Sequence, residues 1–214
     1  MKLARRIAAV GRWSGDEWRV RLTQRGQSLL ERARLSVGRG FGVASATAIP
    51  PGAMAVVAAN AIGPLRGDPS RPREVVRQLA ARDPAGFALI RAAVGRLHRG
   101  YVTLLGLDEV FVGAPPNWHR EVISGKVSPH LHWSRISHLD VGAVGDHKLL
   151  WEVNRHQYLI PVALCWLADG RGEDFDLVQQ HLDSWIEHNP IKVGVNWVSS
   201  LEVAYRGIAW CWLL

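Results

Sequence analysis

Four charged or titratable residues lie close together in one apolar segment. Lys148, Glu152, Arg155 and His156 follow i, i+4 and i+7 spacing, which places them on one face of a helix. The rest of that segment is apolar nearly all round, so we expect this polar face to meet a ligand groove or a buried ion-pair partner. A salt-bridge ladder through Lys148, Glu152 and His156 is the structural alternative.

A second group combines amide, aromatic and charged side chains. Asn196 and Trp197 stand just before an expected helix start, and Glu202, Tyr205 and Arg206 follow within that helix. Hydrogen-bond donors and an aromatic face at a helix N-terminus suit a sugar ring or a carboxylate. Purely local roles stay open: Asn196 as a cap, Trp197 in the core, and Glu202 with Arg206 as a helix-supporting i, i+4 pair.

A third group holds His130 and His132, with His138 and Asp140 further on. Two histidines at i, i+2 share one face of a strand, an arrangement that metal sites use. No fourth ligand has suitable spacing and no cysteine is near, so we expect surface or packed histidines and no metal. The sequence has no P-loop, no GxGxxG after a strand, no GxSxG and no HExxH. We expect no cofactor.

The segments that carry these candidate residues are predicted to be mainly helical. Capping and stop residues frame the last seventy residues: Asp146 starts a helix, Asp169-Gly170 ends it, Asn189-Pro190 ends the next, and Ser199 with Glu202 opens a third. Pro161 is expected to kink the first of these helices. The expected helices are 27–35, 73–81, 84–105, 146–168, 173–188 and 200–214, with irregular structure at 41–72 and a long ordered loop at 106–145.

This pattern predicts an all-α fold. The last three helices follow one another through short turns with no strand alternation between them, which is typical of helical hairpins in a bundle, solenoid or toroid.

Composition narrows the class of partner. Residues 1–110 carry 18 Lys and Arg against 8 Asp and Glu, while residues 111–214 carry 8 against 11. A basic half can serve a polyanion. However, 22 of the 26 basic residues are arginines spread singly through the chain, with no basic run and no aromatic-interleaved patch. We therefore expect no specific nucleic-acid partner.

Membrane and disulfide signals are weak. The apolar stretch 41–65 contains Pro50 and Pro51 near its centre, which disfavours a spanning helix. The stretch after Lys2 is too short for the apolar core of an export signal, so no such signal is expected at this N-terminus. The two cysteines, Cys165 and Cys211, sit among apolar neighbours and are expected to be buried thiols.

Three ordered blocks of sequence resemble one known family. Residues 145–157 (GDHKLLWEVNRHQ) resemble the signature of the heparinase II/III family, and residues 184–190 (SWIEHNP), 194–197 (GVNW) and 199–206 (SSLEVAYR) continue it in order. Upstream, Leu105-Gly106, Asn117-Trp118-His119 and His132-Trp133 resemble the stretch before the signature. The resemblance covers roughly residues 85–214, and ordered blocks are more specific than one motif.

The resemblance implies a bacterial polysaccharide lyase. Such proteins have an N-terminal (α/α) toroid and a β-sandwich domain, and they cleave a uronate-containing acidic polysaccharide by β-elimination. A Tyr and a His act as acid and base, and an Asn/His group neutralises the C5 carboxylate. Family export would place the protein outside the cytoplasm, although no export signal is expected here, so localisation stays open.

This chain departs from the family pattern at its end. The family's Asn-Asn-His tract and its catalytic Tyr and His come after the point where the sequence stops. An apolar end at Trp210–Leu214 also indicates missing covering helices. We therefore expect an N-terminal fragment: a loosely matching region 1–84, then an incomplete (α/α) toroid of antiparallel helical hairpins over 85–214.

On this interpretation the fragment supplies substrate groove and no catalytic residue. The candidate substrate-binding residues are Glu152, Arg155, His156, Asn196, Trp197, Glu202, Tyr205 and Arg206. The expected partners are an acidic polysaccharide and the missing C-terminal region of the parent chain. A non-catalytic carbohydrate-binding or scaffold toroid module is the alternative.

Overall fold

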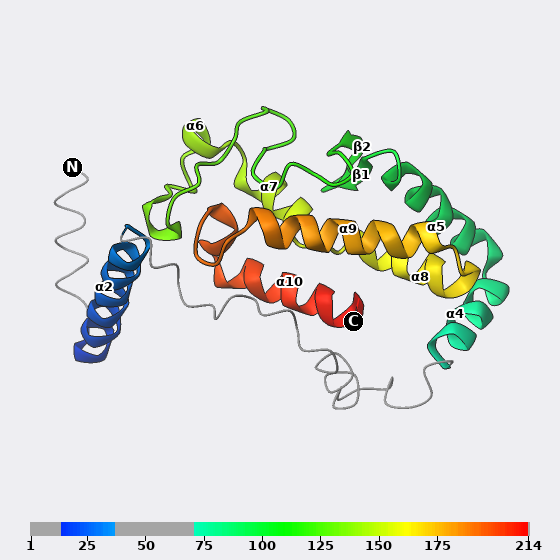
Figure 1. Ribbon diagram of the computed structural model, residues 1–214, viewed down its shortest axis with the longest axis horizontal. Helices are drawn as coiled ribbons and strands as arrows, with labels where there is room; N and C mark the ends of the chain where they lie inside the picture. Colours follow the sequence, from blue (N-terminus) through cyan, green and yellow to red (C-terminus); the bar gives the residue numbers. More distant parts are fainter. Residues whose placement is uncertain (1–13, 37–70, 214) are drawn as a thin grey trace. The chain divides into compact units, whose positions relative to one another are not determined.

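The computed structural model describes residues 14–36 and 71–213 (Figure 1). The expected irregular segment 41–72 lies almost wholly outside these residues. The chain divides into two compact units, Met1–Thr47 and Ala48–Leu214. The described residues are predominantly helical, as the sequence predicts. No helix among them is long and apolar enough to cross a membrane.

The described part of the first unit is one helix, α2 (Gly15–Ser36). Ser14 Oγ accepts from the amide of Glu17 at 3.2 Å, and Glu17 Oε2 accepts from the amide of Ser14 at 3.0 Å. This reciprocal capping box starts the helix well before the predicted Gln27. The side chains of α2 are exposed along most of its length.

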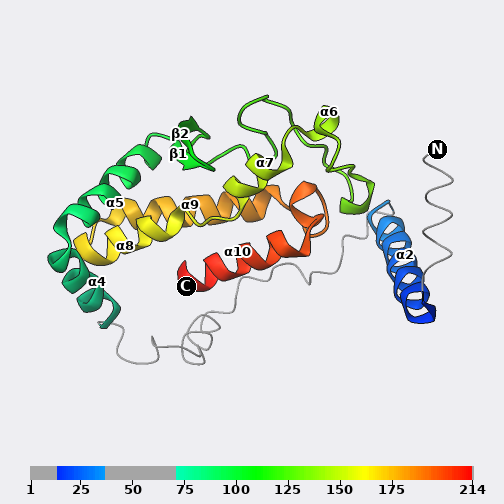
Figure 2. The same cartoon turned by 180° about the vertical axis from the view of Figure 1, so that it is seen from behind.

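The second unit is built on two helices that form an antiparallel hairpin, α8 (Leu159–Asp169) and α9 (Gly172–His188). The predicted helix end is confirmed, because Gly170 closes α8 in the left-handed region at φ 74°. Three further helices pack against α8: α4 (Arg71–Arg82), α5 (Pro84–Leu97) and α10 (Ser200–Leu213). Figures 1 and 2 show this layer from opposite sides, with α9 and α10 running beside α8.

The predicted helix 84–105 ends early, at Leu97, and a β-hairpin replaces its last turns. Strands β1 (Tyr101–Leu104) and β2 (Leu107–Phe111) pair antiparallel, with Tyr101 opposite Phe111. Gly100 turns the chain out of the helix at φ 83°. Leu105 and Gly106 both have positive φ, which is the backbone that a two-residue hairpin turn requires.

The predicted helix 146–168 is two helices, so the predicted kink at Pro161 is wrong. α7 (His147–Asn154) begins at Asp146, whose carboxylate accepts from the amide of Lys148. The chain then turns at His156, at φ 62°, before α8 begins. Pro161 is the third residue of α8, where its missing N–H has no intrahelical acceptor to lose.

The long segment between β2 and α7 is ordered, as expected, and holds a 3₁₀ turn, Trp133–Arg135, and a short helix, α6 (Val141–Val144). The main apolar core collects residues from α4, α5, β1, α7, α8 and α9, with Trp118 from the long segment. Cys165 is buried in this core as predicted. Cys211 is exposed, since the buried face of α10 is formed by Glu202, Arg206 and Ala209. For this thiol the prediction is wrong.

Candidate functional site

Three buried asparagines join separate motif blocks into one hydrogen-bonded network. Asn196 Nδ2 donates to Asn154 Oδ1 and to Asn189 Oδ1, both at 2.8 Å. Trp185 Nε1 also donates to Asn154 Oδ1, at 2.8 Å. Asn154 Nδ2 donates in turn to the carbonyl of Trp118 at 3.0 Å. Residues from the long segment, α7, α9 and the 3₁₀ turn Val195–Trp197 are thus tied together.

Arg206 covers this network from α10. Its side chain is buried, its Nη2 donates to the carbonyl of Asn196 at 3.1 Å, and its guanidinium lies 4.5 Å from the Trp185 ring centroid. Burial lowers the pKa of Arg206 to about 10, and Glu202 opposes this shift. The guanidinium therefore stays charged at neutral pH and forms a cation–π contact with the Trp185 ring.

Arg155 lies outside the network, at the partly exposed edge of the site. Its Nε and Nη2 donate to the two oxygens of Glu202 at 2.7 and 2.9 Å, and its Nη1 donates to Glu152 at 2.5 Å. Its guanidinium also lies 4.6 Å from the Tyr205 ring centroid. The hydrogen bonds with Glu202 raise the pKa of Arg155, against an opposing effect of burial.

This arrangement excludes the salt-bridge ladder through Lys148, Glu152 and His156. Glu152 pairs with Arg155, while His156 turns into the core because the helix breaks before it. Glu202 likewise pairs with Arg155 instead of returning to the start of α10 as a capping-box partner.

Two histidines are fully buried beside Trp118. His156 Nδ1 accepts from Trp210 Nε1 at 2.7 Å, and His181 Nδ1 lies 2.8 Å from the carbonyl of Leu177. Burial lowers the pKa of both, that of His181 to about 4. Burial also raises the pKa of Tyr158, which contacts both imidazoles edge-on. The two imidazoles and the Tyr158 hydroxyl are enclosed by protein and are out of reach of a polymer.

The structure brings the predicted site residues together but divides them into two layers. His156, Asn196, Glu202 and Arg206 are buried, whereas Glu152, Arg155, Trp197 and Tyr205 are partly exposed. We call the second group the rim. Sequence reasoning did not name the other members of the network as site residues, although they lie in the same motif blocks: Trp118, Asn154, Trp185 and Asn189.

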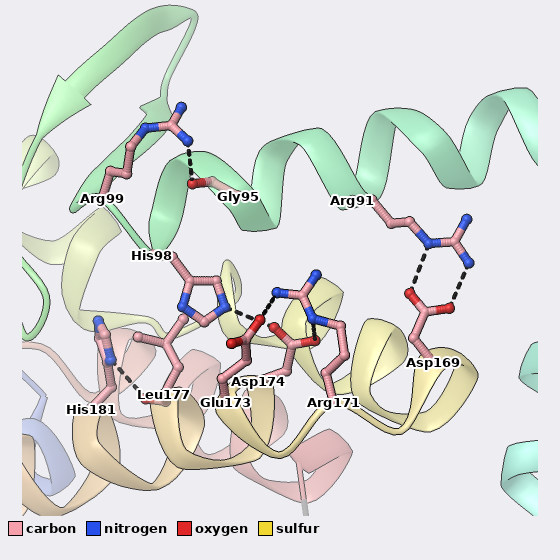
Figure 3. A network of polar contacts seen from close by, with 10 residues as sticks. All are labelled: Arg91, Gly95, His98, Arg99, Asp169, Arg171, Glu173, Asp174, Leu177 and His181. Carbon is pink, nitrogen blue, oxygen red and sulfur yellow. Dashed lines mark hydrogen bonds and ion pairs between the residues drawn. The ribbon is translucent and has the colours of Figure 1, made fainter.

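A second polar cluster lies where α5 meets the start of α9 (Figure 3). His98 Nε2 lies 2.7 Å from Asp174 Oδ1, and Glu173 completes a group that could in principle hold a metal ion. Arg171, however, is ion-paired with both carboxylates and already supplies the positive charge there. We interpret the cluster as a clamp between helices, beside the second clamp Arg91–Asp169.

The histidines of the predicted third group do not converge on a metal site. The ring of His130 lies 3.9 Å from that of His119, while His132 Nδ1 lies 2.8 Å from Ser134 Oγ. His138 instead contacts His147 and Trp151. Within residues 14–36 and 71–213, the cluster at His98 is the one group of three potential ligands close enough for a metal.

Comparison with known proteins finds no match: no family model matches the chain, and neither does any curated protein or solved structure.

Proposed function

We propose that this chain is the groove-forming helical part of a uronate polysaccharide lyase of the heparinase II/III type, with its helical hairpins forming part of an (α/α) toroid. The observation that carries the proposal is the convergence of the motif blocks. Residues up to 78 positions apart, from Trp118 to Asn196, meet in one buried network. Such convergence is expected if the blocks act as one functional unit.

The proposed division of labour follows from burial. The network and Arg206 hold the ends of α7, α9 and α10 in place, and the rim faces outward. Within the rim, Tyr205 and Trp197 offer aromatic surface to a sugar ring, and Arg155 offers a guanidinium edge. Glu152 and Glu202 balance the charges of Arg155 and Arg206. The rim therefore suits recognition of a sugar unit more than strong attraction of a polyanion.

Elimination itself needs more than the rim provides. A base must take the C5 proton, an acid must protonate the leaving oxygen, and donors must neutralise the carboxylate, all within about 3 Å of the substrate. His156 and His181 are fully buried, and the hydroxyl of Tyr158 is enclosed although the residue is partly exposed. We therefore assign binding to this chain, and the catalytic acid and base to other parts of the parent protein.

The test measures binding and elimination separately. The chain is titrated with alginate, chondroitin and heparan sulfate, and the absorbance of the unsaturated product is followed in the ultraviolet. We expect binding without an absorbance rise, and about tenfold weaker binding for Tyr205→Ala. Lys148→Gln, an exposed change on α7, is the matched control. A chain that binds none of these polymers contradicts the proposal. A steady rise abolished by Tyr205→Phe would place the active site in this chain.

A non-catalytic carbohydrate-binding or scaffold module is the second candidate. It is favoured by the burial of His156 and His181, which keeps these two imidazoles away from a bound polymer. Sequencing the gene beyond Leu214 separates the two candidates. An Asn-Asn-His tract followed by a Tyr and a His supports the lyase, and their absence supports the module.

A further inference from the structure

A cleft of about 600 Å³ lies between the segment that follows β2 and the turn 120–127. Its volume is within the range of about 300–1,000 Å³ that is typical of small-ligand sites. Val153 of α7 forms part of the floor. The side chains that a ligand would meet are Phe111, Asn117, Arg120, Ile123 and Ser124.

One wall of the cleft is held rigidly by a buried carboxylate. Glu121 accepts from the amides of Ile123 and Ser124, both at 2.7 Å, and from Ser124 Oγ. Burial alone would raise the pKa of Glu121, but these hydrogen bonds bring it below its usual value. Gly145 packs against Glu121 so closely that a Cβ there would lie 2.8 Å from Glu121 Cβ. The wall is therefore formed before any ligand binds.

Arg120 is the charged side chain that lines the cleft. Its Nε donates to the carbonyl of Gly125 at 3.4 Å, which orients the guanidinium. Among the described residues, no carboxylate forms an ion pair with Arg120, since the neighbouring Glu121 is satisfied within its own turn. The outer N–H groups are thus available to a ligand carboxylate, which a guanidinium binds in a two-pronged manner.

The lips of the cleft are apolar. Phe111 is 63% exposed and Ile123 is 64% exposed, although both are large hydrophobic side chains. The Phe111 ring is supported by Tyr101, with ring centroids 5.2 Å apart. Asn117 and Ser124 add polar groups between these lips. An aromatic face, amide and hydroxyl groups and one unpaired guanidinium match a sugar ring that carries a carboxylate.

We propose that this cleft binds one uronate unit of the polymer, with the ring carboxylate on Arg120 and an apolar sugar face on Phe111. The inference rests on the proposed function and deepens it. It adds a binding subsite apart from the rim, built from the segment that follows β2 and from the turn 120–127.

The test uses the full chain and defined tetrasaccharides at about 0.15 M salt, where exposed charges are screened beyond roughly 8 Å. Calorimetric titration compares an unsulfated uronate tetrasaccharide with its carboxyl-reduced form. We expect Arg120→Gln to weaken uronate binding about tenfold or more and to leave binding of the reduced sugar within twofold. Phe111→Ala should weaken binding of both. Arg135→Gln, an exposed arginine outside the cleft lining, is the matched control.

The outcomes separate this inference from the proposed function. If the chain binds the uronate, and Tyr205→Ala weakens binding while Arg120→Gln matches Arg135→Gln, the cleft assignment is wrong and the proposed function stands. If the unmodified chain binds neither the tetrasaccharide nor the polymers, the proposed function fails. A sulfated tetrasaccharide without carboxylates that binds equally tightly overturns the carboxylate assignment. Circular dichroism confirms that the variants fold, and Arg120→Lys should bind between Arg120→Gln and the unmodified chain.

Discussion

At the scale of single residues, the asparagines Asn154, Asn189 and Asn196 form a structural network, although sequence reasoning assigned Asn196 to ligand binding and Asn189 to a helix end. Each is almost completely buried. Asn196 Nδ2 donates to the side-chain oxygens of Asn154 and Asn189, and the indole of Trp185 also donates to Asn154, whereas Asn196 Oδ1 has no hydrogen-bond partner among the described residues. Buried polar groups of this kind hold a unique arrangement only while all partners are present. The motif is therefore informative about the shape of the site even where its members never touch a ligand.

Asn196→Ala should destabilise the protein by about 2–4 kcal/mol. The change removes the donor of Asn189 Oδ1 and leaves this buried carbonyl without that partner, while Asn154 Oδ1 keeps the indole of Trp185. Urea unfolding followed by circular dichroism measures the loss. Gln180→Ala, at an exposed amide side chain on α9, should stay within about 0.5 kcal/mol. Equal effects of the two changes would show that the network adds no stability.

Acidification should destabilise the protein between about pH 7 and pH 4. Burial lowers the pKa of His156 and His181, that of His181 to about 4, so the unfolded chain binds more protons than the folded one as the pH falls. This stability is complete above the unfolded pKa near 6.5 and is lost toward the folded value. At pH 5 the protonation of His181 alone should lower the free energy of unfolding by about 2 kcal/mol. Urea midpoints at pH 7.5 and pH 5 test this, and His181→Leu should flatten the difference. A midpoint that does not change with pH contradicts it.

At the scale of elements, local capping and stop residues predicted helix ends better than hydrophobic spacing did. Gly170 closes α8 and Asn189 closes α9 as expected. The end of α5 was missed because Leu97, Tyr101 and Leu104 keep helical spacing, although the last two belong to β1. The break after α7 depends on His156, whose backbone lies in the left-handed region. The types of the neighbouring residues do not predict this conformation. Tertiary packing around Trp210 and Trp118 selects it.

The same reasoning explains which site residues were predictable. The rim and the network come from motif blocks that can be read in sequence, so their residues were found or stood beside those found. The cleft at Arg120 was not, because Phe111 and Arg120 come from a hairpin and a loop whose approach depends on the fold. Only the scattered Gly, Pro, Trp and His residues in 106–145, which follow no sustained period, marked that segment as a long ordered loop.

Alanine substitutions at two glycines separate the cost of a strained backbone from the cost of a steric clash. Gly145 and Gly170 have nearly equal φ, at 75° and 74°, yet only a Cβ at Gly145 would collide with a neighbour, Glu121. We expect Gly170→Ala to cost about 1 kcal/mol, from the left-handed backbone alone. Gly145→Ala should cost about 3 kcal/mol or more. Paired urea titrations give both values, and equal losses would mean that the turn beside the cleft adjusts freely.

At the scale of the whole molecule, the excess positive charge belongs to the first unit, and the buried hydrophobic core of the described residues belongs to the second. Residues 1–47 carry 10 Lys and Arg against 3 Asp and Glu, whereas residues 48–214 carry 16 of each. The first unit thus accounts for the whole net charge of +7. The buried hydrophobic residues of the described chain, in contrast, all lie between Val76 and Ala209. Polyanion attraction and fold stability should therefore be separable.

A chain shortened to residues 48–214 should fold with its thermal midpoint within about 2 °C of the full chain, because the described core lies entirely inside it. It should also lose the weak, salt-dependent retention on DNA that we expect of the full chain, because nonspecific affinity comes from released counterions and needs excess positive charge. Chromatography on immobilised DNA over a salt gradient compares the two chains. If the shortened chain is retained to the same salt concentration, a local basic surface of the second unit carries the attraction. Binding of the uronate tetrasaccharide should survive the truncation, since Arg120, Phe111 and the rim all lie in the second unit.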